Sequence, residues 1–171
     1  SEIIFSEIKE IETEEIFENF FIKPTEKNIV VDIPLTPDFA TCESCETELF
    51  DEHNPRYFYP FTTCTQCGPR YSVTKKFPFE RENTAIEVFK MCPNCLEEYR
   101  TPDDVRFHSQ TNSCPNCGIQ IWLKGNQGNK FKGSNKEIFE KLAKELSKGK
   151  IVALKNTAGY LLMCDATNSA A

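Results

Sequence analysis

The spacing of its cysteines constrains this chain more than any other feature. Eight of its nine cysteines form four Cys-x2-Cys pairs, separated in turn by 18, 24 and 18 residues. Two thiolates in such a pair can bind one metal ion, and two pairs complete a tetrahedral site with no open position for water or substrate. The spacing therefore predicts two structural metal sites, with Cys42, Cys45, Cys64, Cys67, Cys92, Cys95, Cys114 and Cys117 as the ligands.

The repetition extends beyond the cysteines. At an offset of fifty residues, Arg56 aligns with Arg106 and Glu48 with Glu98, which predicts ion pairs between these arginines and nearby acids. The second pair of each half is followed by glycine. We expect a tight turn there, with backbone N–H groups directed at the sulfurs.

Three chemistries share this pattern: zinc sites, iron–sulfur clusters and disulfides. Two-residue gaps favour metal or redox chemistry over structural bridges, and a duplicated pattern of this spacing is more common for zinc than for iron–sulfur clusters. The duplication favours one zinc ion per repeat. An interleaved or nested pairing of the cysteines is also consistent with the spacing.

Other metal-binding side chains are not needed at these sites. Because eight cysteines fill two tetrahedral sites, His53 and His108 are predicted to be surface or hydrogen-bonding residues. The ninth cysteine, Cys164, lies in an apolar run and is predicted to be a small core residue. The aromatic residues between the pairs are predicted to pack in small clusters around the metals.

Composition argues against two classes of partner. The formal net charge is -6, and each four-thiolate zinc site adds about two further negative charges. No cluster of Lys and Arg lies between the cysteine pairs, so nucleic-acid binding is disfavoured. No apolar stretch has the length of a membrane span.

The chain divides into three zones. Residues 1–36 contain near-alternating apolar positions, typical of one or two strands, and Pro24, Pro34 and Pro37 indicate an extended linker after them. Residues 37–124 are the tandem four-cysteine module. In residues 125–171 a Gly-rich linker precedes a helix with a capping box formed by Ser134 and Glu137, and Gly149 ends the helix before a strand.

Three segments carry a resemblance to a known family: FTTCTQCGPRYSVT, CPNCLEEYRTPDDVRFHSQTNSCPNCG and GKIVALKNTAGYLLMCDATN. With the cysteine spacing, they resemble the hydrogenase-maturation carbamoyltransferases of the HypF family. The resemblance implies a small zinc-stabilised α+β fold with tandem zinc-ribbon-like repeats. Residues 1–36 would be the tail of a ferredoxin-like acylphosphatase domain, and 125–171 the linker and first helix and strand of a YrdC-like α/β domain.

The resemblance also implies a function for the complete enzyme. Such cytoplasmic enzymes use carbamoyl phosphate and ATP to carbamoylate the C-terminal cysteine of a HypE-type partner protein, a step towards the cyanide ligands of [NiFe] hydrogenase. The expected cofactor of this span is two zinc ions. The acylphosphatase loop is absent from it, so we expect an internal part of a larger enzyme that is inactive alone. The alternative is a free-standing zinc-ribbon interaction module without catalysis.

One further residue enters through the resemblance. The family motif K-G-x-G-G-[FY]-H-L reads KNTAGYLL here, which keeps Lys155 and Gly159 but places Leu161 where histidine is usual. Lys155 is therefore a candidate contact to nucleotide phosphate. A solvated lysine at the end of a strand is the competing interpretation.

Overall fold

The computed structural model describes residues 6–10, 12, 18–19, 36–156 and 159–171. The chain divides into two units, Ser1–Val30 and Val31–Ala171, and every helix and strand given below lies in the second. The strands expected in residues 1–36 fall mostly outside the described residues and stay a prediction.

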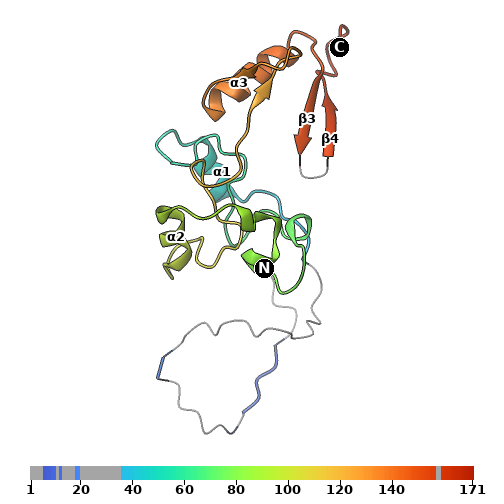
Figure 1. Ribbon diagram of the computed structural model, residues 1–171. Helices are drawn as coiled ribbons and strands as arrows, with labels where there is room; N and C mark the ends of the chain where they lie inside the picture. Colours follow the sequence, from blue (N-terminus) through green and yellow to red (C-terminus); the bar gives the residue numbers. More distant parts are fainter. Residues whose placement is uncertain (1–5, 11, 13–17, 20–35, 157–158) are drawn as a thin grey trace. The chain divides into compact units, whose positions relative to one another are not determined.

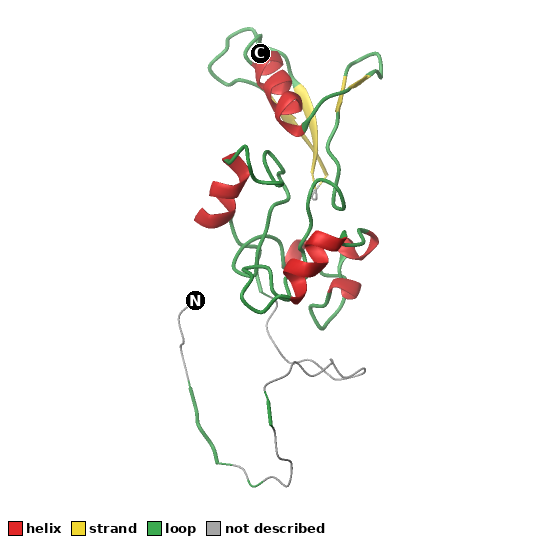
Figure 2. Cartoon of the chain, turned by 90° about the vertical axis from the view of Figure 1, so that its left-hand side faces the viewer, coloured by secondary structure: helices red, strands yellow, loops and turns green. Residues whose placement is uncertain are grey.

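Short elements joined by long loops make up the second unit (Figures 1 and 2). The helices and strands are α1 (Glu43–Phe50), η1 (Tyr71–Val73), η2 (Arg81–Asn83), η3 (Ala85–Val88), α2 (Pro93–Arg100), β1 (Leu123–Lys124), β2 (Lys130–Phe131), α3 (Asn135–Leu146), β3 (Val152–Asn156) and β4 (Gly159–Met163).

Each repeat begins with a helix that starts at its first cysteine. Cys42 and Cys92 are the N-cap residues of α1 and α2, and their carbonyls accept the first helical hydrogen bonds at 2.9 Å. Pro93 opens α2, where its fixed φ and missing N–H cost nothing. The second cysteine of each pair, Cys45 or Cys95, is buried one turn into the helix.

The loops after these helices also match at the offset of fifty residues. Phe58 and His108 both adopt left-handed backbone conformations, with φ of 52° and 55°. Their N–H groups donate to the carbonyls of Leu49 and Tyr99, at 2.8 and 3.0 Å. Side chains other than glycine adopt this conformation only where surrounding contacts hold it, so both repeats impose the same local structure.

The core of this module consists largely of sulfur and polar groups. Five of its buried residues are cysteines, and Arg56, Arg106, Asn112 and several Ser and Thr side chains are buried among them. The prediction that the aromatic residues pack in clusters holds only in part, because Tyr59 is buried against Phe61 whereas Phe50, Tyr71 and Trp122 are exposed. Cysteines and polar side chains make up most of the buried residues of this module in place of large rings.

The segment between the repeats is held by Arg81. Its guanidinium donates to the carbonyls of Gln110, Asn112 and Phe89 at 2.8, 2.9 and 2.6 Å. This arginine thus fastens the connection to the second repeat through backbone groups.

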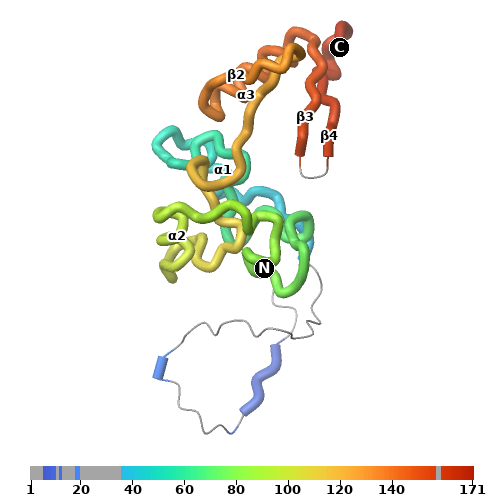
Figure 3. Tube along the Cα trace, in the orientation of Figure 1, coloured from blue at the N-terminus to red at the C-terminus, as the bar shows by residue number. Residues whose placement is uncertain are grey.

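The third zone contains the helix predicted from its capping signals. Ser134 and Glu137 form the complete capping box of α3, and Gly149 follows the helix with φ of +78°. β3 and β4 then form an antiparallel hairpin in which Val152 pairs with Met163 and Asn156 with Gly159 (Figure 3).

Cys164 differs from its prediction. It is exposed rather than a core residue, and Tyr160, Leu161 and Leu162 on the adjoining strand are exposed too. An apolar run makes a core residue only where another layer covers it, and in the described part of the chain this hairpin has no such layer.

Helix α3 contacts the first repeat, although it follows the second in sequence. The rings of Phe139 and Phe58 lie 6.2 Å apart between centroids, and the Lys136 ammonium lies 5.8 Å from the centre of the Tyr57 ring.

Within the described residues, no helix has the length and apolar character that crossing a membrane requires.

Candidate metal centres

The eight paired cysteines gather into two groups of four. Within each group all four sulfur atoms lie within 4.8 Å of one another. One group is Cys42, Cys45, Cys64 and Cys67, and the other is Cys92, Cys95, Cys114 and Cys117. Each repeat therefore brings together its own four sulfurs, and none of the nine cysteines forms a disulfide.

The sulfur separations fit a tetrahedral metal ion. Zn–S bonds of about 2.3 Å in tetrahedral geometry place sulfurs about 3.8 Å apart. The observed separations are 3.7 Å for Cys42–Cys64 and 3.8 Å for Cys64–Cys67. In the second repeat they are 3.8 Å for Cys92–Cys114, 3.8 Å for Cys114–Cys117 and 3.6 Å for Cys95–Cys117. Disulfide sulfurs lie about 2.0 Å apart, so this is the geometry of ligands.

Burial shifts the pKa values of the cysteine thiols. It raises the pKa of Cys45 and of Cys95, and neighbouring sulfurs raise both further. A bound dication reverses this balance because it stabilises the thiolates directly. The backbone contributes as well, since the N–H of Gln66 donates to the Cys64 sulfur at 3.3 Å, as expected for the turn before Gly68.

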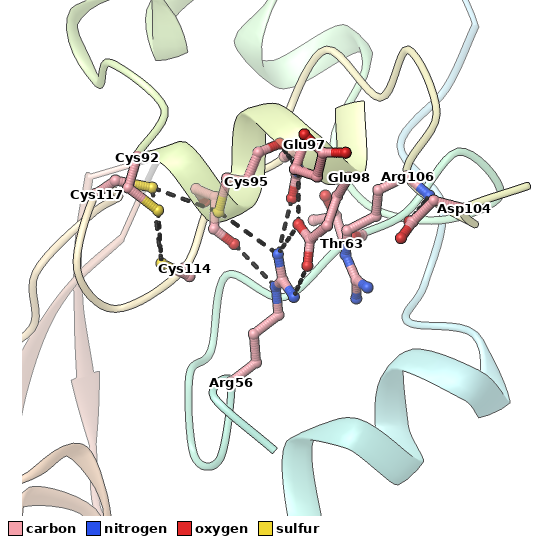
Figure 4. A network of polar contacts seen from close by, with 12 residues as sticks. Arg56, Thr63, Cys92, Cys95, Glu97, Glu98, Asp104, Arg106, Cys114 and Cys117 are labelled. Atoms are coloured by element: carbon pink, nitrogen blue, oxygen red, sulfur yellow. Dashed lines mark hydrogen bonds and ion pairs between the residues drawn. The ribbon is translucent and has the colours of Figure 1, made fainter. Parts of the chain in front are cut away.

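Arg56 belongs to the first repeat but donates to the second (Figure 4). Its Nε donates to the carbonyl of Ser113 at 3.0 Å, and its Nη2 to Asn112 Oδ1 at 3.0 Å and to the Cys95 sulfur at 3.6 Å. Its two terminal nitrogens bind the two carboxylate oxygens of Glu98, at 2.8 and 2.6 Å. The Arg56 residue is only 2% exposed.

Arg106 makes the reciprocal contacts. Its Nε donates to the carbonyl of Thr63 at 3.0 Å, and its Nη1 donates to Glu48 at 3.1 Å. Nη2 also binds Glu48 and lies 3.9 Å from the Cys45 sulfur. The predicted arginine–acid pairs exist, but each crosses from one repeat to the other.

The charges in this network are compensated. Burial acts to raise the pKa of Glu98, but hydrogen bonds from Arg56 and Asn112 and the charge of Arg56 outweigh it and lower that pKa. Burial likewise acts to lower the pKa of Arg56, and Glu98 outweighs it and raises that pKa. The pair therefore stays ionised beside the second cysteine group.

Two hydroxyl contacts join the repeats next to their third cysteines. Thr63 and Thr111 hydroxyls lie 2.9 Å apart, and those of Tyr59 and Ser113 lie 3.2 Å apart. Gly118 permits the second contact, since a Cβ there would lie 2.0 Å from the Tyr59 hydroxyl oxygen. Close approach rather than a left-handed turn therefore requires this glycine, whereas Gly68 has φ of +91°.

The other singled-out residues lie away from the sulfurs. His53 is beside Glu52 on the surface, with 3.8 Å between Nε2 and the carboxylate, and the His108 ring packs against the rings of Tyr99 and Phe107. Neither histidine belongs to a described metal-ligand group. Lys155 is exposed, donates to the Asn156 carbonyl at 3.2 Å, and its ammonium lies 5.5 Å from the centre of the Tyr160 ring.

Comparison with known proteins identifies both cysteine repeats. A family model described as the HypF finger matches residues 41–74 and 91–124. The two matched segments coincide with the two groups of four cysteines.

Longer relatives match most of the chain. A carbamoyltransferase HypF from Rhodobacter capsulatus is 42% identical over 79% of this chain and 18% of its own length. A probable carbamoyltransferase HypF from Methanocaldococcus jannaschii is 38% identical over 92% of this chain and 20% of its own. The crystal structure of T. kodakarensis HypF matches 81% of this chain and 18% of its own, with TM-score 0.72 and 40% identity. The chain thus spans about a fifth of the length of the curated relatives it matches.

Proposed function

This chain belongs to the HypF family through its zinc-finger region, and from that premise we propose that it is the zinc-binding portion of a carbamoyltransferase. Each group of four cysteines binds one zinc ion. The complete enzyme uses carbamoyl phosphate and ATP to carbamoylate the C-terminal cysteine of a HypE-type partner during [NiFe]-hydrogenase maturation. The observation that carries the zinc assignment is the sulfur separation of 3.6–3.8 Å within each group.

The zinc ions act through structure. A site closed by four sulfurs has no position for water, so it supplies folding free energy and fixed geometry rather than Lewis acidity. In the complete enzyme, the role that we propose for the module is to set the spacing between the catalytic domains on either side of it. The contact of Phe139 in α3 with Phe58 of the first repeat supports this role.

Elemental analysis of the 171-residue chain tests the metal assignment. We expect two zinc ions per chain, and one in the Cys92→Ser variant. The matched control is Cys164→Ser, which removes an exposed cysteine outside both groups and should retain two. Iron in place of zinc, or less than one zinc per chain, contradicts the assignment.

Activity assays test the role. The chain alone should not cleave ATP in response to carbamoyl phosphate. In a full-length HypF bearing this region, Cys92→Ser should impair coupled carbamoyl transfer more than acylphosphatase activity measured alone. Normal transfer after verified loss of zinc contradicts the role, and favours an interaction module without a part in catalysis.

A further inference from the structure

Each arginine of the network connects the two halves of the other repeat. In the second repeat, Arg56 binds Cys95 and Glu98 on α2 and also the carbonyl of Ser113, which directly precedes Cys114. These contacts bring the two cysteine pairs of that repeat together, although 18 residues separate the pairs in sequence. A planar guanidinium can do this because its donors point in several fixed directions at once.

The position of Arg56 depends on its own repeat. It lies in the loop between Cys45 and Cys64, where its N–H donates to Asn54 Oδ1 and its carbonyl accepts from Tyr59, at 2.9 and 2.8 Å. A metal ion that joins Cys45 to Cys64 closes this loop and restricts the positions open to Arg56. A metal ion in the first repeat therefore favours the position of Arg56 that holds the two cysteine pairs of the second repeat together.

The reciprocal argument holds for Arg106. It lies in the loop between Cys95 and Cys114, and it joins Glu48 and Cys45 on α1 to the carbonyl of Thr63, next to Cys64. Arg106 is 3% exposed, so water does not substitute for these contacts.

We infer that the two zinc sites load cooperatively, and that Arg56 and Arg106 are positioning residues for the metal of the repeat to which they do not belong. The inference rests on the zinc sites proposed above. Coupling of this kind is reciprocal, so each ion strengthens the binding of the other by the same factor, typically about 5- to 150-fold. Replacement of a residue that hydrogen-bonds to a metal ligand commonly changes metal affinity by about 10- to 100-fold.

Site-resolved zinc loss tests the inference. The zinc-loaded 171-residue chain is challenged with a chelator and an alkylating reagent, and protected cysteines are quantified by mass spectrometry. Cleavage after Lys90 separates the cysteines of the two repeats. Arg56→Lys should increase the rate of cysteine alkylation in the second repeat by about tenfold and that in the first repeat by less. Lysine keeps the positive charge but lacks the planar set of N–H donors of arginine. Arg106→Lys should show the opposite preference.

Arg100→Lys is the matched control. This arginine lies on α2 within the second repeat but is exposed, and its replacement should leave both groups protected. If Arg56→Lys loosens chiefly the first repeat, or both repeats equally, the cross-positioning is wrong. Glu98→Gln provides a second variant that preserves the shape of the network; it should also loosen the second repeat first.

Zinc titration tests the coupling itself. The dissociation constant of the second site is measured in the unaltered chain and in Cys64→Ser, whose first site is incomplete. We expect weakening by about fivefold or more at the second site, the lower bound of typical coupling. An unchanged constant overturns the inference while leaving two zinc sites in place. Failure of the unaltered chain to bind two zinc ions instead contradicts the proposed metal sites.

Discussion

Arg56 of the first repeat forms a two-pronged ion pair with Glu98 of the second, with nitrogen–oxygen distances of 2.8 and 2.6 Å. Arg106 and Glu48 form the equivalent pair in the opposite direction. The duplicated module is thus interlocked, because each repeat contributes the cation to a buried pair and receives one in return.

Replacing Arg56 by methionine should destabilise the zinc-loaded chain by about 3 kcal/mol. The variant leaves the largely buried carboxylate of Glu98 without its cation, and such losses typically cost about 3–5 kcal/mol. Glu98 is partly open to solvent, which sets the expected value at the lower end. The measurement is the free energy of unfolding from denaturant titration at fixed zinc concentration.

Lys75→Met is the control for that loss of charge. The Lys75–Glu87 pair spans 2.5 Å but is exposed, and exposed pairs contribute at most about 1 kcal/mol. The double variant Arg56→Met/Glu98→Gln should recover part of the loss, because it removes the unpaired carboxylate. Equal effects of Arg56→Met and Lys75→Met would refute the structural role of the buried pair.

Glu98→Gln should increase chelator-induced zinc release by the same factor at every pH between about 8 and 5, a range above the ordinary carboxyl pKa. Because the folded-state pKa of Glu98 is lowered, its pairing stabilises the fold above the ordinary value and is lost only as the pH falls through the lowered one. Chelator-induced zinc release from both proteins across this range measures this factor. If the two proteins release zinc at equal rates near pH 6 while both still bind two zinc ions, the pKa of Glu98 is not lowered.

Gly118→Ala should destabilise the second repeat because the new Cβ has no room. It would lie 2.0 Å from the Tyr59 hydroxyl oxygen and 2.7 Å from the Ser113 Cβ. Tyr59→Phe should therefore partly restore the melting temperature of Gly118→Ala by removing one of the two clashes. Gly125→Ala is the control, since its nearest atom lies at 3.9 Å. No rescue by Tyr59→Phe would place the clash at Ser113 alone.

The sequence repeat identified the interlocking residues but not the direction of their contacts. Alignment at an offset of fifty residues shows that Arg56 and Arg106 are equivalent. The two arginines would align in this way whether each bound an acid of its own repeat or of the other repeat. Only the three-dimensional arrangement distinguishes these cases. Tyr59 and Asn112 had no such signal, because their equivalents are Ser109 and Thr62.

Local signals were more informative than hydrophobicity. The capping box of Ser134 and Glu137 is confirmed because it depends only on neighbours within four residues. The burial predicted for Cys164 is wrong because burial depends on which other segments cover a strand. The same reason explains the exposed Phe50 and Trp122.

The contact between α3 and the first repeat leads to the last prediction. Phe139→Ala should increase amide hydrogen exchange in α3 while both zinc ions remain bound, because it removes the ring that contacts Phe58. Such aromatic contacts contribute about 1 kcal/mol beyond buried area, or roughly a fivefold change in local opening. Lys144→Ala, at an exposed position of the same helix, should change exchange less. If the first metal site supports α3 through Phe58, Cys64→Ser should increase exchange in α3 as well. An effect of Phe139→Ala without one of Cys64→Ser would mean that the helix contacts the repeat but does not depend on its metal.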